Sequence, residues 1–226
     1  MDYIWLDSET PILNQVPRGF QSAAILLHPF VQMPLRWSDN HQESPGQFIY
    51  PNNEEIITYG SPVSWNQVMN STDLNTYQEV ALALKTSISA LRVEYAREDL
   101  ADKLNANLHA DLYYPTDDGI SVFLVDNILK VLSSNSSNKV YFSAPIFQKS
   151  GWLEISDTTP VGIADLTPNE LILTDENNDH TFMTMYDSFV TVYLSRVTNI
   201  GEIIKSMKWE AIECHRETYI NWYLQR

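Results

Sequence analysis

Proline and glycine are distributed unevenly along this sequence, and that distribution restricts where helices can form. Seven of the eleven prolines lie in residues 1–62, whereas residues 63–114 contain neither proline nor glycine. Because proline breaks a helix interior and glycine weakens it, helices of ordinary length are expected only after residue 62. In the proline-rich part the apolar runs predict short strands, joined by ordered loops, at residues 3–6, 23–28, 47–50 and 55–58.

The next part, residues 63–134, is predicted to be helical. Thr76 and Glu79 have the spacing of a capping box, and apolar residues then recur every three or four positions as far as Tyr95. The pattern breaks at residues 97–99 and then resumes, which predicts two helices joined by a bend. A third helix is expected after Asp117 and Asp118, which suit an N-cap, and residues 133–138 have the composition of a loop.

The remaining part, residues 139–226, alternates in the manner of a sheet. It predicts two hairpins, a further strand, a short helix and a last strand before an aromatic-rich tail. These elements are expected at residues 139–147 with 152–156, at 171–174 with 181–186, and at 189–194, 200–207 and 209–214.

These patterns together predict a single α+β domain over residues 1–226. Its parts are a strand-and-loop part (1–62), a helical part (63–134) and a sheet-rich part (139–226). We expect a mixed, mostly antiparallel sheet packed against a central group of about three helices.

Charge narrows the range of partners. The chain has a net charge of −15, and residues 150–195 contain no Lys or Arg. Such a surface repels phosphate backbones and anionic lipid headgroups and attracts cationic partners. The sequence therefore disfavours nucleic-acid and membrane binding and predicts a cationic protein partner. The acidic residues predicted to contact that partner are Asp175, Glu176, Asp179 and Asp187.

The sequence also predicts a cytoplasmic protein. Cys214 is the single cysteine, so no internal disulfide can form. The N-terminus lacks the basic region of a secretory signal, and no apolar run near it approaches the roughly 20 residues that span a bilayer.

Histidines at strand ends offer one catalytic hypothesis. His28 ends one predicted strand and His215 follows another, so the two imidazoles could meet if those strands were neighbours. With Asp187 as an orienting carboxylate, they could bind a metal or activate a water. The ordinary alternative is that each histidine hydrogen-bonds a carbonyl group.

Two further motifs have structural interpretations that the sequence favours. In the turn at residues 175–180, Asp175, Asn177 and Asp179 match the spacing of a calcium loop. His180 replaces the required glycine, however, so a hairpin turn with local backbone bonds is preferred. Cys214 lies beside acidic residues that would raise its pKa, which favours a buried thiol over a nucleophile.

Part of the C-terminal region is similar to uncharacterised bacterial families of small cytosolic proteins. The pattern comprises an acidic hairpin that begins Leu171-Ile172-Leu173-Thr174-Asp175, a strand after Asp187-Ser188-Phe189, and the segment from Glu213 to Thr218 with Trp222. Some relatives in that broad class neutralise toxins as immunity proteins. The resemblance implies a bacterial cytosolic setting and assigns no catalytic residues.

The first hypothesis for function is therefore a non-enzymatic protein-interaction protein, of immunity type in its most specific form. One alternative is a hydrolase or metal-dependent enzyme that uses His28, His215 and Asp187. Another is a small-molecule binding module. No cofactor or metal is predicted, and the oligomeric state is left open.

Overall fold

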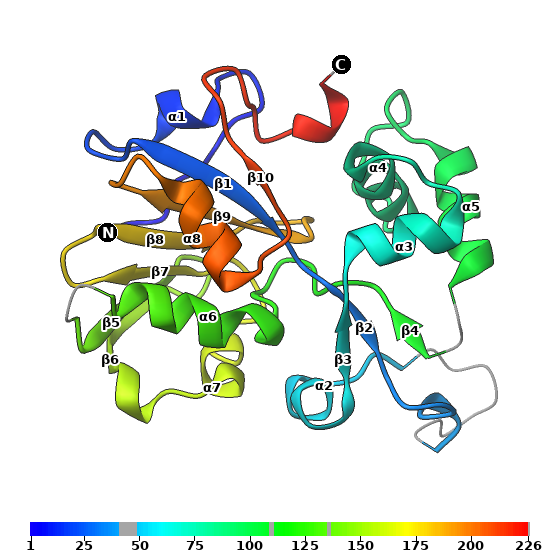
Figure 1. The fold of residues 1–226 in the computed structure, drawn as a ribbon, viewed down its shortest axis with the longest axis horizontal. Helices are drawn as coiled ribbons and strands as arrows, with labels where there is room; N and C mark the ends of the chain where they lie inside the picture. The colour runs from blue at the N-terminus through cyan, green and yellow to red at the C-terminus, as the bar shows by residue number, and fades with distance from the viewer. Residues whose placement is uncertain (41–48, 109–110, 135–136, 226) are drawn as a thin grey trace. The chain divides into compact units, whose positions relative to one another are not determined.

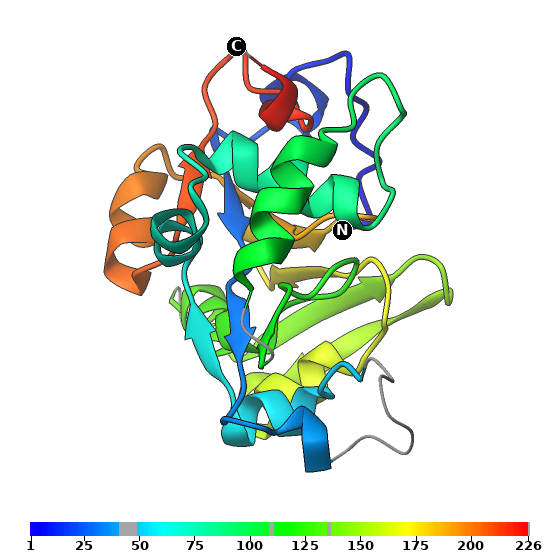
Figure 2. The ribbon, with the colours of Figure 1, turned by 90° about the vertical axis from the view of Figure 1, so that its right-hand side faces the viewer.

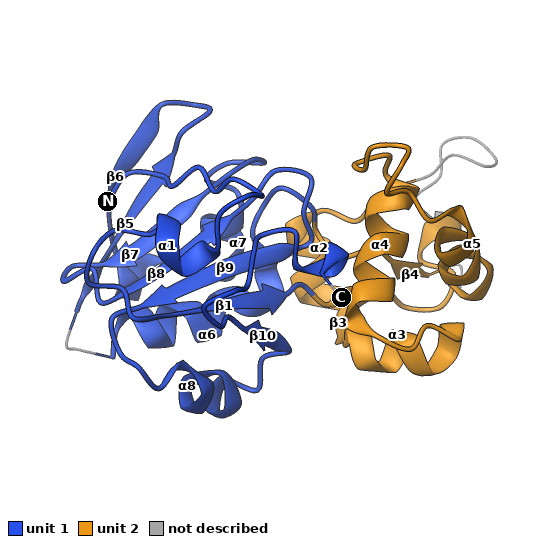
Figure 3. Ribbon diagram, turned by 90° about the horizontal axis from the view of Figure 1, so that it is seen from above, with its two compact units in different colours: residues 1–28, 117–226 blue, residues 29–116 orange. Residues whose placement is uncertain are grey.

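The computed structural model describes residues 1–40, 49–108, 111–134 and 137–225. The chain forms two compact units (Figure 3), and unit 2 is inserted into unit 1. Unit 1 contains residues 1–28 and 117–226, and unit 2 contains residues 29–116. This division does not decide whether residues 1–226 behave as one domain, which stays a prediction.

Unit 1 is built on an antiparallel sheet whose described strands have the order β10-β1-β9-β8-β7-β5-β6 (Figure 1). Every residue of the four neighbouring strands β1, β9, β8 and β7 is buried, so these strands form the core of the unit. The predicted α+β class is confirmed. The prediction of one mixed sheet is wrong, because the described strands form two sheets and every pairing between named strands is antiparallel. The strands are β1 (Ser22–Leu27), β5 (Lys139–Ala144), β6 (Lys149–Glu154), β7 (Ile172–Asp175), β8 (His180–Thr184), β9 (Val190–Ser195) and β10 (Ala211–Glu213).

The predicted hairpins of unit 1 are both present. β5 pairs with β6 and β7 pairs with β8, in each case antiparallel. The first hairpin turns at residues 145–148, a few positions before the predicted turn, because the backbone N–H of Gln148 donates to the carbonyl of Pro145 (3.2 Å). Pro145 therefore lies in the turn and removes no hydrogen bond from the sheet.

The helices of unit 1 are α1 (Ile12–Gln15), α6 (Val122–Leu132), α7 (Pro160–Ala164) and α8 (Ile200–Met207). The unit also contains short 3-10 turns at η2 (Ile155–Asp157) and η3 (Trp222–Leu224). α6 and α8 lie on one face of the sheet (Figures 1 and 3), and the Asn127 side chain of α6 donates to the carbonyl of Met207 (3.0 Å). α8 has the predicted bounds.

The cap predicted for the third helix is wrong. α6 begins at Val122 with Ser121 at its N-cap, three positions after Asp118. Asp118 instead lies in the preceding loop with a left-handed backbone (φ 53°), and its Oδ1 accepts a hydrogen bond from the Asp187 N–H. The two predicted aspartates are consequently available for contacts elsewhere in unit 1.

Unit 2 combines a small antiparallel sheet of order β3-β2-β4 with helices. α4 and α5, two of the three predicted helices, belong to this unit, whereas α6 belongs to unit 1. The elements are β2 (Phe30–Gln32), η1 (Ser38–Asn40), α2 (Asn53–Tyr59), β3 (Ser61–Val63), α3 (Trp65–Thr72), α4 (Tyr77–Ser87), α5 (Glu98–Asn107) and β4 (Leu112–Tyr113).

Residues 55–58 form a helix, and the prediction of a strand there is wrong. The Asn52 side chain accepts a hydrogen bond from the Glu55 backbone N–H, and the Glu55 carboxylate accepts one from the Asn52 N–H (2.9 Å each). This capping box satisfies two free donors at the start of α2 and outweighs the β-branched pair Ile56-Ile57.

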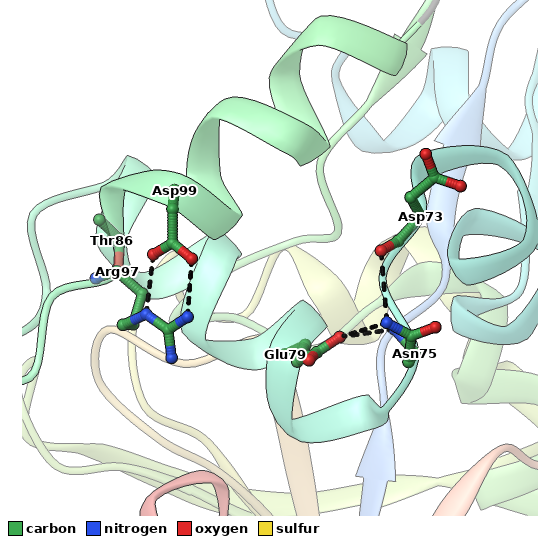
Figure 4. Close-up of polar contacts among 6 residues, drawn as sticks. All are labelled: Asp73, Asn75, Glu79, Thr86, Arg97 and Asp99. Carbon is green, nitrogen blue, oxygen red and sulfur yellow. Dashed lines mark hydrogen bonds and ion pairs between the residues drawn. The ribbon is translucent and has the colours of Figure 1, made fainter.

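The start of α4 is close to the prediction. Thr76 Oγ1 accepts a hydrogen bond from the Glu79 N–H (3.1 Å), as an N-cap should. The Glu79 carboxylate reaches the N–H of Asn75 instead of that of Thr76 (Figure 4). α4 ends at Ser87, earlier than predicted, and Arg97 pairs with Asp99 at the start of α5 (2.7 Å).

Two other predicted strands have different outcomes. Residues 3–6 form no strand, although the Tyr3 hydroxyl donates to the carbonyl of Thr184 (2.6 Å). Half of the strand predicted at 47–50 lies outside the described residues, and the described half, residues 49–50, forms no strand. Part of the loop predicted at 133–138 also lies outside the described residues. No helix in the described part of the chain is long and apolar enough to cross a membrane.

Candidate functional site

The structure does not bring His28 and His215 together. Their strands are neighbours, as the histidine hypothesis required, but β1 and β10 are antiparallel, with Ala24 opposite Glu213 and Leu26 opposite Ala211. His28 therefore follows one end of the strand pair and His215 lies beyond the other, about 20 Å apart at about 3.3 Å per residue. The two imidazoles cannot share one centre in this fold.

His28 lies at the same end of the sheet as Asp187. Its side chain is fully buried, with Nε2 2.8 Å from Thr191 Oγ1, and its backbone N–H donates to the carbonyl of Phe189 (2.9 Å). Asp187 is two residues before Phe189, in the turn between β8 and β9. His28 and Asp187, two of the three predicted catalytic residues, therefore lie near the turn between β8 and β9. His215 is exposed beyond the opposite end of the β1–β10 pair.

Asp118 joins this turn from the loop before α6. Its Oδ1 accepts a hydrogen bond from the Asp187 N–H, and its own N–H donates to the carbonyl of Ser188 (3.2 Å). Both aspartates have left-handed backbones, with φ of 53° and 46°. Asp tolerates this conformation better than most residues. The two aspartates lie where the loop before α6 meets the turn between β8 and β9.

Glu170 completes the group from the segment before β7. Its side chain is only 3% exposed, and Oε2 has no hydrogen-bond partner among the described residues. Its neighbour Leu171 exchanges hydrogen bonds with Thr184 at the end of β8, which places Glu170 at the same end of the sheet. A buried carboxyl oxygen without a donor is costly and rare in folded proteins.

We call Asp117, Asp118, Glu170 and Asp187 the acidic cluster. Burial raises the pKa of Asp118, and the negative charges of Asp117, Asp187 and Glu170 raise it further, while the hydrogen bond from Asp187 N–H opposes the shift. Burial also raises the pKa of Tyr3, with a further contribution from Glu170. The segments that supply these residues contain no Lys or Arg in the sequence. No neighbouring cation along these segments therefore offsets the repulsion among the carboxylates.

The other predicted contact residues lie at the opposite end of β7 and β8. Asp175 is 1% exposed, and both of its carboxylate oxygens accept hydrogen bonds in the turn, Oδ1 from His180 N–H (2.7 Å) and Oδ2 from Asn177 N–H (3.1 Å). Its carboxylate therefore faces backbone amides and not solvent. Glu176 is exposed and Asp179 is half-buried in the same turn, separated from Asp187 by the length of β8.

The turn at residues 175–180 is a hairpin turn, as the sequence favoured. Asn178 has a left-handed backbone (φ 56°), and its N–H donates to the carbonyl of Asp175 (3.1 Å). Among the described residues, no group of three or more His, Cys, Asp or Glu side chains is placed to hold a metal ion. The two histidines at 41 and 109 lie outside the described residues.

A buried Ser–His pair occurs next to this turn. His180 Nδ1 lies 2.9 Å from Tyr193 Oη and 3.1 Å from Ser195 Oγ. Asp175 binds the backbone of His180 and not its ring, so the arrangement lacks the carboxylate that orients a catalytic imidazole. All four residues are buried on the sheet, and the network is best understood as satisfied polar groups in the core.

Cys214 behaves as the sequence favoured. Burial raises the pKa of its thiol to about 12, so the thiolate is scarce at neutral pH. Its backbone N–H donates to the carbonyl of Ala23 (2.9 Å) as β10 ends. The thiol has no feature of an activated nucleophile.

These features define an α+β protein with a carboxylate cluster at one end of an antiparallel sheet. The chain belongs to the family described as "Protein of unknown function (DUF2711)", whose model matches residues 8–224. It is similar to the uncharacterized protein YwbB of Bacillus subtilis (strain 168), with 48% identity over 223 residues and 99% of each chain covered. No solved structure matches it. The predicted resemblance to an uncharacterised bacterial family is confirmed and extends over nearly the whole chain.

Sequence reasoning missed Asp118 and Glu170 as site residues. The sequence pattern predicts a helix cap at Asp118, and it places Glu170 only within residues 150–195, which contain no Lys or Arg. A usable signal exists for Glu170, because it directly precedes the apolar run Leu171-Ile172-Leu173 of a buried strand. Glu170 is buried at that boundary, and an ionisable side chain is rarely fully buried unless it has a partner.

Proposed function

We propose that this protein binds a cationic protein partner through the acidic cluster of unit 1. The observation that carries the proposal is Glu170, a carboxylate that is only 3% exposed and whose Oε2 lacks a hydrogen-bond donor within the described residues. Asp118 and Asp187, both half-buried, are joined by a hydrogen bond from the Asp187 N–H, and the neighbouring Asp117 is exposed. A cationic side chain at this end would experience the combined negative potential of these carboxylates.

The electrostatics of the cluster favour a cationic ligand over a neutral one. Charges beneath the surface are screened less by water and salt than exposed charges are. Glu170 therefore adds to the potential that Asp117, Asp118 and Asp187 create at the surface. A Lys or Arg side chain from a partner would relieve the repulsion that raises the pKa of Asp118 and would gain charge-assisted hydrogen bonds.

The whole molecule supports association with the same kind of partner. A net charge of −15 accelerates encounter with a cationic protein, and complementarity of this kind increases the rate and the specificity of binding more than its affinity. Glu176 and Asp179, at the opposite end of the sheet, remain predicted as contacts that act at longer range. An immunity-type role, with a toxin as the cationic partner, is the most specific form of the proposal.

The test is a pull-down from native lysate with the full chain as bait, washed at low and at high salt. We expect a protein partner that is retained at low salt and released at high salt. The double variant Asp117→Asn/Asp118→Asn should lose it, because two charges disappear while the amide oxygen at position 118 still accepts the hydrogen bond from Asp187 N–H.

The matched control is Asp157→Asn/Glu202→Gln, which removes the same net charge from two exposed positions outside the cluster. It should retain the partner. If both double variants lost the partner equally, net charge alone would explain the binding and the site would be wrong. If no salt-sensitive partner were found, the proposed function itself would fail.

The catalytic alternative has less support. His28 and Asp187 are held at one turn, but His215 lies at the other end of the strand pair, so the predicted three-residue centre does not assemble. His28 is also fully buried, with Thr191 Oγ1 at 2.8 Å from its Nε2. We therefore favour the binding function.

A further inference from the structure

The β5–β6 hairpin lies largely within one of the stretches of this acidic chain that contain no acidic residue. Residues 127–153 carry Lys130, Lys139 and Lys149 and neither Asp nor Glu, in a protein whose net charge is −15. Most of this segment is the β5–β6 hairpin, which projects from the body of unit 1 (Figures 2 and 3). Two copies of the chain would repel each other less where these hairpins meet than where their acidic clusters face each other.

The hairpin also ends the sheet with an exposed strand. β6 is the edge strand, and within the described residues it pairs only with β5. Its outer backbone groups can accept another strand, and natural proteins usually protect such an edge. The apolar side chains here are instead exposed, with values of 54% for Ile146, 46% for Phe147 and 52% for Trp152.

The aromatic side chains of the hairpin are ordered by their neighbours. Trp152 lies edge-on to Tyr141, its cross-strand partner, with ring centroids 5.3 Å apart. The ammonium of Lys149 lies 5.9 Å from the centre of the Phe147 ring. The exposed surface is therefore preorganised, which lowers the entropy that association would cost.

We propose that β6 pairs antiparallel with β6 of a second copy of this chain, extending the sheet across a two-fold axis. In an antiparallel two-fold pair of identical strands, directly opposed residues have side chains on the same face. One residue must therefore lie opposite its own copy, with the axis midway between the two. Gly151 or Trp152, at the middle of the strand, suits that position. Either choice places the exposed Trp152 side chains of the two copies close together, where an aromatic contact stabilises the pairing.

Charge favours a second copy in this orientation. Lys149 begins β6 and Glu154 ends it. Antiparallel pairing places the cationic end of each strand beside the anionic end of the other, whereas parallel pairing would place like charges together. Because the copies carry the same net charge, added salt should strengthen the dimer, whereas it should weaken binding of a cationic partner at the acidic cluster.

The experiment is sedimentation velocity of the full chain from about 1 µM to about 200 µM, a range that covers a weak dimer. We expect a concentration-dependent dimer. Trp152→Glu should weaken it by about 30-fold or more, because it places two charges near the axis. Trp5→Glu is the matched control, since Trp5 is also exposed (65%) and also contacts a tyrosine ring edge-on, and it should leave the dimer intact.

Cysteine cross-linking tests the register in a Cys214→Ala background. Gly151→Cys or Trp152→Cys should form an intermolecular disulfide. The Cβ atoms of a residue that lies opposite its own copy are about 4.5–5.5 Å apart. The Phe142 ring lies 3.3 Å from a side chain added at Gly151, so it must shift slightly. Ser156→Cys, exposed beyond the strand, should form none.

Three results would overturn the proposal. The chain could remain monomeric at every concentration, or Trp5→Glu could weaken the dimer as much as Trp152→Glu. The third is a monomer that binds vesicles of phosphatidylcholine and phosphatidylglycerol and loses that binding in Trp152→Glu, which would assign the hairpin to a membrane surface instead.

Discussion

The backbone N–H of Asp187 donates a hydrogen bond to Oδ1 of Asp118, a residue 69 positions earlier in the chain. The Asp118 N–H donates in turn to the carbonyl of Ser188, 3.2 Å away. This reciprocal pair attaches the loop before α6 to the turn between β8 and β9. The same carboxylate therefore supports the fold and contributes charge to the acidic cluster.

Replacing Asp118 separates those two roles. We expect Asp118→Ala to lower the free energy of unfolding by about 1–3 kcal/mol, because Asp187 N–H loses its acceptor and alanine is strained at positive φ. Asp118→Asn keeps the acceptor and tolerates a φ of 53°, so its cost should be clearly smaller. Urea unfolding of the two variants measures this difference. Equal costs would mean that the hydrogen bond to Asp187 contributes little.

Acid should stabilise the wild type relative to Asp118→Asn. The pKa of Asp118 is raised above its ordinary value of 3.8, first by burial and then by the neighbouring carboxylates. The folded protein then binds a proton that the unfolded chain releases, so this contribution is complete below 3.8 and is lost as the pH rises through the folded pKa. Unfolding free energies of both proteins measured between about pH 6 and pH 4 should diverge in favour of the wild type.

His180 should produce the opposite dependence. Burial lowers the pKa of its imidazole below 6.5, although the charges of Asp175 and Asp179 oppose the shift. The folded protein favours the neutral ring, so this contribution is present above 6.5 and is lost as the pH falls toward the folded pKa. NMR titration of His180 should show a midpoint below 6.5. A midpoint above that value would indicate that the two carboxylates dominate over burial.

The turn between β7 and β8 should depend on Asp175 far more than on its neighbours. Both oxygens of this buried carboxylate accept backbone hydrogen bonds, from His180 and Asn177. We expect Asp175→Ala to cost about 1–3 kcal/mol in the free energy of unfolding, because two amides lose their acceptor. Asn177→Ala is the control, since Asn177 contributes its backbone N–H and its side chain is exposed. Comparable losses in thermal unfolding would contradict this account.

Local patterns predicted the elements whose hydrogen bonds close within a few residues. The turn at 175–180, the N-cap at Thr76 and helix α8 depend on neighbours in sequence, and their positions agree closely with the structure. Residues 55–58 were predicted as a strand because Ile56 and Ile57 favour strands, yet the capping box at Asn52 decides for a helix. Where two local signals compete, side chains that satisfy backbone donors outweigh β propensity here.

The acidic cluster could not be predicted in the same way. Asp118, Glu170 and Asp187 come from three separate loops, and only the order and direction of the strands bring those loops to one end of the sheet. For the same reason, the sequence could not show whether His28 and His215 lie at the same end of their strands. Their strands are neighbours, but direction depends on the packing of the whole sheet, which no short pattern contains.

The insertion of unit 2 into unit 1 has a consequence for synthesis on the ribosome. β1 is made early, but both of its sheet partners, β9 and β10, lie within residues 190–213. Unit 2, residues 29–116, is translated in full before either partner exists. We therefore expect nascent chains released near residue 150 to contain a protease-resistant unit 2, while the apolar segment Ala23-Ala24-Ile25-Leu26-Leu27 still lacks its neighbours and is open to chaperones.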